Sequence, residues 1–225
     1  MGYSWHFALT AVFIEGIIFI ILTLTNVSET IVNALPQSLK NAIGAGIGLF
    51  IAFVGLSSSG IIVHNDATHV ALGNITEVSP LLAVIDIVIT GFMYAKKVPG
   101  AILIGIVITM LIGIPMGLTE FRGVVSQPES IEPLFCKFQI ENIFTLDMLV
   151  IVFTFFFIDM FDTMGTLVGV CTKAKMIKDD GSIPRLEETF LADAIATTVG
   201  ASIGASTTTT YVESADGVAQ GGRLA

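Results

Sequence analysis

The chain has 225 residues, of which 53% are hydrophobic and only 13% are charged. Soluble globular proteins are about one quarter charged, and the mean hydropathy of this chain is +0.86, so the composition excludes an ordinary soluble domain. A net charge of −9 argues against nucleic-acid binding, which requires a basic patch or groove. The composition therefore predicts a membrane protein.

The apolar residues form blocks separated by short polar stretches. Several blocks approach the roughly 18–20 residues that cross about 30 Å of hydrocarbon. The predicted fold class is an all-α polytopic membrane protein with about seven transmembrane segments, located in the inner or plasma membrane. In chain order these segments cover residues 7–24, 38–56, 80–95, 99–118, 146–170 and 188–203, followed by a half-helix or truncated span from about residue 211.

Basic residues set the predicted orientation. Those in the connections after the third and fifth segments are Lys96, Lys97, Lys173, Lys175, Lys178 and Arg185. Both connections lie on one side of the membrane if the segments alternate, and the excess of Lys and Arg places that side in the cytoplasm. The connections at residues 64–79 and 119–141 then face outward.

Acidic residues enter the predicted spans, whereas all ten Lys and Arg lie in connections or at span ends. The acids concerned are Glu15, Asp86, Asp159, Asp162, Asp193 and Glu213. An ionised carboxylate at membrane depth costs roughly 2.5–3.5 kcal/mol or more. Each acid therefore has to be protonated, hydrogen-bonded to neutral donors, or open to a water-filled cavity. A proton-coupled transporter uses the first and the third of these arrangements.

Asp159 and Asp162 form the most informative pair of acids. They are three residues apart, so on a helix both face the same side. Two close carboxylates resist double ionisation, which favours the uptake of one proton; the alternative is that they fix the helix bundle by hydrogen bonds. Glu15 and Asp86 are each alone on their span, and for these two we expect a polar contact between helices.

A run of four threonines, Thr207–Thr210, follows the sixth predicted span. β-Branched residues favour extended backbone over helix. Extended backbone at membrane depth is tolerated only inside protein or beside a cavity. The run and Glu213 after it predict a discontinuous helix, the usual form of a transporter binding site. An ordinary loop between two spans is the alternative.

Residues 157–167 and 206–214, which contain these acids and threonines, resemble the nucleobase–cation symporter superfamily of xanthine/uracil permease type. The closer likeness is to its azaguanine-like branch of adenine, guanine and hypoxanthine permeases, supported by Ala192–Ala194 and residues 221–223. The resemblance implies a larger transporter of seven-plus-seven inverted repeats, of which this chain looks like a central fragment.

The resemblance also implies a division into domains. Residues 1–30 correspond to a core-domain span and residues 31–118 to gate-domain spans. Residues 119–145 correspond to an external connection. Residues 146–225 correspond to core-domain spans that end in a discontinuous helix.

Site residues follow from the same resemblance. It implies that Asp159 and Glu213 bind the nucleobase, whose ring N–H and exocyclic amino groups are donors that carboxylates accept. The residues expected to complete the substrate contacts are Thr163, Ser206, Thr207 and Thr208. Asp162 is implied near the proton-coupling position, together with Thr163, and Asp193 supports the site. Phe155, Phe156 or Phe161 could stack on the ring.

The implied function is the import of purine nucleobases such as hypoxanthine, guanine and adenine. H⁺ is the expected coupling ion and Na⁺ the alternative, and no cofactor or metal is expected. The expected partners are the purine and the lipid bilayer, with no nucleic acid; a homodimer of the full-length protein is compatible with this picture. An anion carrier of the sulfate or bicarbonate type is the alternative function. An intramembrane enzyme is disfavoured, because the sequence has no Ser/His or HExxH arrangement.

Overall fold

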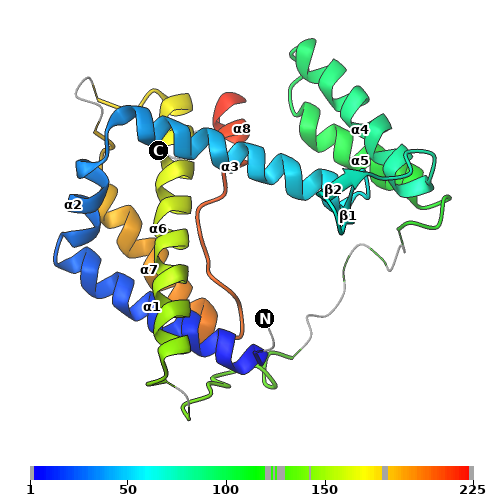
Figure 1. Cartoon of the computed structure of the whole chain (residues 1–225). Helices are drawn as coiled ribbons and strands as arrows, with labels where there is room; N and C mark the ends of the chain where they lie inside the picture. The colour runs from blue at the N-terminus through cyan, green and yellow to red at the C-terminus, as the bar shows by residue number, and fades with distance from the viewer. Residues whose placement is uncertain are drawn as a thin grey trace. The chain divides into compact units, whose positions relative to one another are not determined.

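The computed structural model describes residues 3–119, 123, 125, 130–141, 143–178 and 182–222, with Gln37 described by its backbone alone. Its elements in chain order are α1 (Trp5–Leu24), α2 (Val27–Ala34), α3 (Gln37–Ser58), β1 (Ile62–Asn65), β2 (His69–Leu72), α4 (Val78–Ala95), α5 (Ala101–Gly113), α6 (Leu146–Ala174), α7 (Leu186–Ser202) and α8 (Ser214–Ala219) (Figure 1). The predicted external connection, residues 119–145, lies partly outside the described residues.

Each predicted segment contains a helix, so the structure is that of a mostly helical membrane protein. Four helices are long and apolar enough to cross a membrane, namely α1, α3 from Ser38, α4 and α6. The apolar α5 has only 13 residues: it begins at Ala101, after Gly100 in a left-handed conformation (φ 69°), and it ends at Gly113. The number of membrane crossings and the inverted repeat remain predictions.

The all-α prediction is wrong in one place, where β1 and β2 form an antiparallel hairpin with His64 opposite Val70. The turn is held locally. The Asn65 side-chain oxygen accepts the backbone amides of Ala67 (2.9 Å) and Thr68 (3.1 Å), which is the turn chemistry typical of Asn. The short helix α2 was also missed; its eight residues lie in a stretch that the sequence analysis assigned to a connection.

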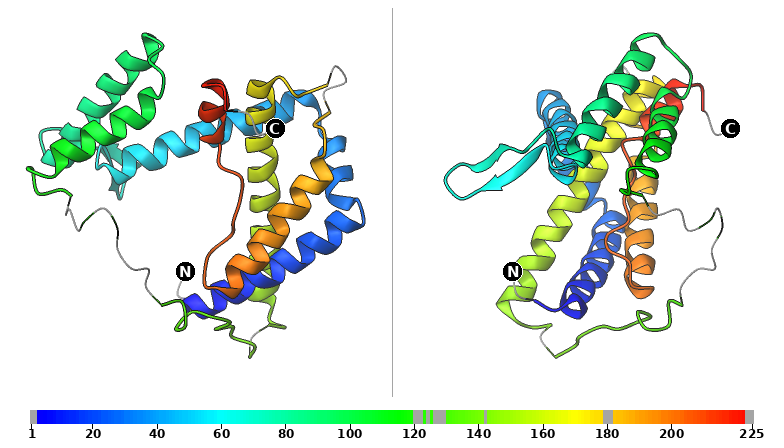
Figure 2. Two further views of the ribbon diagram at one scale, coloured as in Figure 1. Left: turned by 180° about the vertical axis from the view of Figure 1, so that it is seen from behind. Right: turned by 90° about the vertical axis from the view of Figure 1, so that its right-hand side faces the viewer.

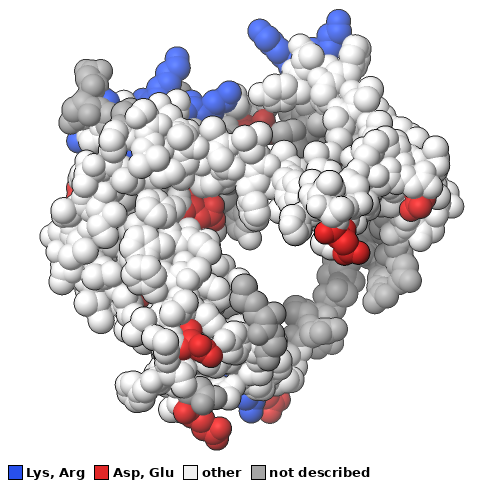
Figure 3. Space-filling view, viewed as in Figure 1, with Lys and Arg blue, Asp and Glu red and all other residues white. Residues whose placement is uncertain are grey.

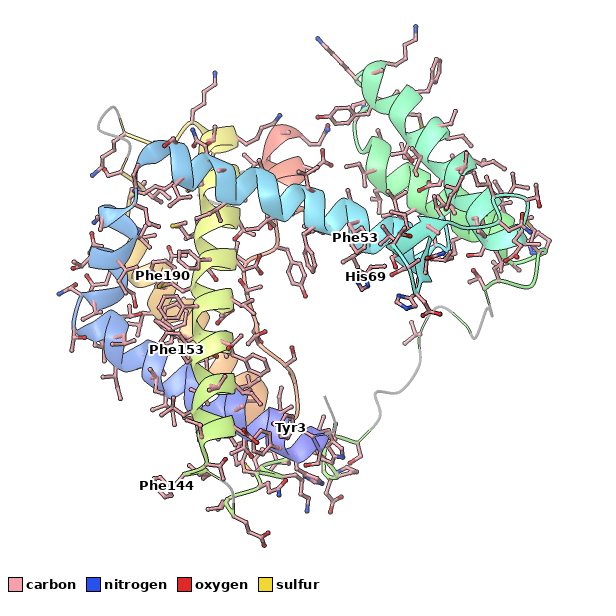
Figure 4. The ribbon with its side chains drawn as sticks, in the orientation of Figure 1. Tyr3, Phe53, His69, Phe144, Phe153 and Phe190 are labelled. Atoms are coloured by element: carbon pink, nitrogen blue, oxygen red, sulfur yellow. The ribbon has the colours of Figure 1, made fainter. Side chains whose placement is uncertain are left out.

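The structure consists of two compact units. Unit 1 contains Met1–Ile47 and Glu129–Ala225, and unit 2 contains Gly48–Pro128. The core of unit 1 lies between α1, α2, α6 and α7, where the Phe19 ring packs on Phe156 (5.4 Å between centroids) and Phe190 (5.5 Å). Figure 4 shows Phe190 inside this unit, whereas Phe144 points away from it.

Unit 2 contains a polar contact that the sequence analysis predicted. Asp86 of α4 accepts hydrogen bonds from the hydroxyls of Thr109 on α5 (2.7 Å) and Thr90 on its own helix (3.2 Å). Large apolar side chains of this unit are widely exposed, as at Phe92 (64%) and Leu103 (67%). So much exposed apolar surface indicates contact with lipid or with further protein.

One end of unit 1 is tied by the segment that precedes α6. The backbone amide of Gln139 donates to the Thr10 hydroxyl of α1 (2.7 Å). The backbone amide of Cys136 donates to the Ser202 carbonyl at the end of α7 (2.8 Å). This segment therefore links the two helices at one end, while basic side chains gather at the other end, where α6 terminates (Figure 3).

Helices α1 and α7 approach each other closely at Gly16. A Cβ atom added there would lie 3.1 Å from the Thr198 backbone nitrogen and closer still to its hydroxyl, whereas a Cβ at Gly46 of α3 would meet no described atom within 4 Å.

We expect Gly16→Ala to lower the free energy of unfolding by about 1–3 kcal/mol, as overpacking does, and Gly46→Ala to leave it unchanged or raised. Thermal unfolding of the full-length protein in detergent measures both; equal melting temperatures would contradict the close packing.

Candidate functional site

The candidate site lies in unit 1, where a cavity of about 300 Å³ opens between α1, α6 and the segment after α7. Its volume is at the lower end of the roughly 300–1,000 Å³ typical of ligand sites. The polar lining consists of Asp159, Asp162, Ser206 and Thr207. The apolar lining consists of Ala8, Val12, Phe155 and Ile158.

The two aspartates face one cavity because their three-residue spacing on α6 places them on the same side of the helix. Asp159 is 3% exposed and its Oδ2 is buried with no hydrogen-bond partner in the described structure. Asp162, one turn further on, is half-buried. The predicted common face of Asp159 and Asp162 is therefore confirmed.

The threonine run forms the extended wall of the site. Residues 205–211 have no regular secondary structure and run alongside α6 before the short helix α8 begins (Figures 1 and 2). The Thr197 hydroxyl of α7 donates to the Thr208 carbonyl and accepts the Thr208 amide, each at 3.1 Å. One hydroxyl thus satisfies both backbone groups of a residue that has no helical partners.

A second polar contact ties the run to α6 and α7 together. The Thr163 hydroxyl donates to Asp193 Oδ2 (2.6 Å) and lies 2.8 Å from the Thr209 hydroxyl. Because Thr163 has only one O–H group, Thr209 is the donor in the second contact. Asp193 also accepts the backbone amide of Thr210. Asp193 and Thr163 therefore hold the threonine run in place by hydrogen bonds, although neither residue lines the cavity.

Glu213 lies apart from the cavity lining. It is the exposed residue before α8, makes no capping hydrogen bond with its side chain, and its charge acts on Asp162. The expected half-helix is only six residues long. Thr208 likewise contributes its backbone to α7 and is not among the residues that line the cavity.

Among the aromatic candidates for stacking, Phe155 lines the cavity, whereas Phe156 is 5% exposed and packs in the core. A larger groove of about 600 Å³ runs along α1 and α6, but every residue that lines it is apolar, including Ile14 and Phe157. Such a surface offers no side-chain acceptor to a polar heterocycle. The smaller cavity is therefore the better candidate for a polar ligand.

The polar contact between helices that the sequence analysis expected for Glu15 is absent from the described structure. Glu15 is fully buried, and neither carboxyl oxygen has a hydrogen-bond partner in the described structure. The charges that act on it are those of Asp159 and Asp193. Its isolated position in an apolar span was the available signal. Within the described residues, no group of His, Cys, Asp and Glu is arranged to hold a metal ion.

Comparison with known proteins gives the family. The model of a permease family, that of the xanthine/uracil permeases, matches residues 1–224. The chain is 50% identical over 221 residues to the Methanocaldococcus jannaschii protein MJ0326, whose name gives it as a permease without a substrate; the match covers 98% of this chain and 51% of that protein.

Two further relatives are named for the bases they carry. The guanine/hypoxanthine permease PbuG of Bacillus subtilis is 43% identical over 223 residues, covering 98% of this chain and 50% of the relative. The adenine permease AdeP of Escherichia coli is 35% identical over 223 residues, covering 99% and 50%. The chain thus spans about half the length of these curated relatives. With the family model matching nearly every residue, the chain belongs to the xanthine/uracil permease family, whose members are membrane transporters rather than enzymes.

Proposed function

We propose that the protein containing this chain transports purine nucleobases and holds the base in the cavity beside Asp159. The observation that carries the proposal is the lining of this cavity, in which two carboxyl groups of α6 face hydroxyl-bearing residues of the threonine run. The relatives named for guanine, hypoxanthine and adenine support the same substrate class.

The chemistry of a purine fits this lining. Ring N–H and exocyclic amino groups are donors, and a carboxylate accepts two of them side by side. The aromatic Phe155 gives the ring an apolar face on which to stack. An anion such as sulfate would instead meet the like charges of Asp159 and Asp162, and the names of the relatives do not favour an anion carrier.

The finer parts of the proposal concern coupling and movement. In the described structure the one ion pair is that of His64 and Asp66 in the hairpin, so no cation neutralises the acids of the site. H⁺ coupling is proposed over Na⁺ coupling because a carboxyl group without a cation partner can lose its charge by taking up a proton, with Asp162 close to the coupling position. The core and gate division given by the family resemblance is proposed as the moving arrangement.

Removal of the Asp159 charge is the first test. Asp159→Asn in the full-length protein should reduce uptake of radiolabelled hypoxanthine or adenine at least about tenfold, since hydrogen bonds to charged groups are worth roughly 1.5–3 kcal/mol. Asp86→Asn, in the α4–α5 contact, is the matched control and should keep its uptake. Normal uptake by the Asp159 variant, with wild-type amounts in the membrane, would refute this site; sulfate uptake that purines do not inhibit would refute the substrate class.

Glu213 is tested separately because it lies outside the cavity lining. The proposal from the family resemblance is that it also binds the base, in which case Glu213→Gln should abolish uptake as Asp159→Asn does. A Glu213→Gln protein with an unchanged KM for the base would remove Glu213 from the site and leave the assignment of Asp159 standing.

The support given by Thr163 can be tested with a matched pair of substitutions. Thr163→Val removes the donor to Asp193 and leaves that carboxyl short of a partner, a loss of about 1–3 kcal/mol; Thr163→Ser keeps the hydroxyl. We expect the valine variant to raise the KM for the base several-fold because the threonine run loosens, and the serine variant to stay near wild type. Uptake kinetics measure this, and equal KM values in the two variants would contradict it.

A further inference from the structure

Glu15 is a buried carboxyl group without a hydrogen-bond or ion-pair partner that would stabilise its charge in the described structure. It lies in the middle of α1, is 0% exposed, and neither Oε1 nor Oε2 has a hydrogen-bond partner in the part of the chain that the structure describes. An unpaired ionised carboxylate in such surroundings is strongly unfavourable. In this conformation Glu15 is therefore best accommodated as the neutral acid.

The groups that face Glu15 are themselves acids. Helix α7 contributes Asp193 and helix α6 contributes Asp159, with Asp162 one turn further along. Helix α2 carries Glu29, which accepts the side-chain amide of Asn33 (3.3 Å) and is not among the charges that act on Glu15.

The basic side chains on α1 and α6 are several helical turns away from the buried acids. Lys173 is fourteen residues from Asp159 on α6, roughly 21 Å at the usual helical rise, and His6 is nine residues from Glu15 on α1, roughly 13 Å. No ion pair to Glu15, Asp159 or Asp193 occurs within the described residues. A proton is thus the means by which this set of acids can lower its charge.

A neutral Glu15 carries one O–H donor, which needs an acceptor. Asp193 already accepts from Thr163 and from the Thr210 amide. Asp159 Oδ2, in contrast, is the other buried carboxyl oxygen without a partner in the described structure. This oxygen is the candidate acceptor for the Glu15 O–H group, directly or through one bridging water. Asp159 also lines the cavity, so it lies between Glu15 and the proposed substrate position.

We propose that Glu15 holds the proton that accompanies the nucleobase, with Asp159 as the group that exchanges it. The inference rests on the proposed function. The step is a transfer of one proton from the Glu15 carboxyl to the Asp159 carboxylate, or the reverse, with water in the cavity as the outer donor and acceptor. No other bond forms or breaks.

This arrangement links base binding to the protonation of Glu15. With Glu15 protonated, Asp159 can stay ionised and accept the N–H groups of the base. With Glu15 ionised, the repulsion between the two charges drives the proton onto Asp159, which then loses an acceptor. Among the forms of the pair that hold a single proton, the base therefore selects the one in which Glu15 carries it and Asp159 is ionised.

Glu15→Gln tests the inference, because an amide resembles the protonated acid and cannot release a proton. The full-length variant in proteoliposomes should still exchange labelled hypoxanthine for unlabelled hypoxanthine, within about twofold of wild type. It should still bind the base, because Asp159 is unchanged, and its accumulation driven by an inward proton gradient should fall at least tenfold. Glu29→Gln, the matched control on α2, should behave as wild type in all three measurements.

Proton-driven accumulation by Glu15→Gln at the wild-type level would overturn the inference, as would accumulation that follows a Na⁺ gradient alone. Glu15→Asp keeps a titratable group and serves as the test if the glutamine variant does not fold. It should retain accumulation, but the pH at which accumulation is half-maximal should shift. An unchanged pH of half-maximal accumulation would count against Glu15. If the wild-type protein transports no purine, the proposed function fails and this inference with it; if it transports purine while Glu15→Gln is unaffected, only the inference fails.

Discussion

The arrangement of the site depends on a backbone segment without helical hydrogen bonds between two helices. Residues 206–210 make no backbone hydrogen bonds with one another in the described structure, and lipid would offer them no partner. Thr197 and Asp193 of α7 supply partners to Thr208 and Thr210. The threonine run is therefore held where it forms a wall of the cavity, and the polar residues of α7 have a structural reason to be buried.

The second constraint is electrostatic: the buried charged groups of the site are all acidic. The carboxyl groups of Glu15, Asp159 and Asp193 come from three helices and converge where no Lys or Arg of the described structure pairs with them. Hydroxyl and amide donors stabilise Asp193, whereas Glu15 and one oxygen of Asp159 lack such donors. The acids are thus unequal, and this inequality distinguishes a group that supports the wall from groups suited to exchanging a proton.

Much of this could be predicted from the sequence, because span length, hydropathy and helical spacing are local properties. They located the long helices, the common face of Asp159 and Asp162, the Asp86 contact between helices and the extended threonine run. The hairpin was missed because its two strands have only four residues each and its turn depends on the Asn65 side chain. The burial of Glu15 and the distance of Glu213 from the cavity depend on how helices pack, which periodicity within one segment does not specify.

The segment before α6 has a mechanical consequence. By bonding to Thr10 of α1 and to Ser202 of α7 it fastens two helices that already approach closely at Gly16, so these two form one stiff body. Helix α6 is joined to that body by apolar packing against α1, by the Thr163–Asp193 contact and through the threonine run. If the cavity changes width, the compliant boundary is the one between α6 and the run, where a few hydroxyl groups can exchange partners without unpacking an apolar interface.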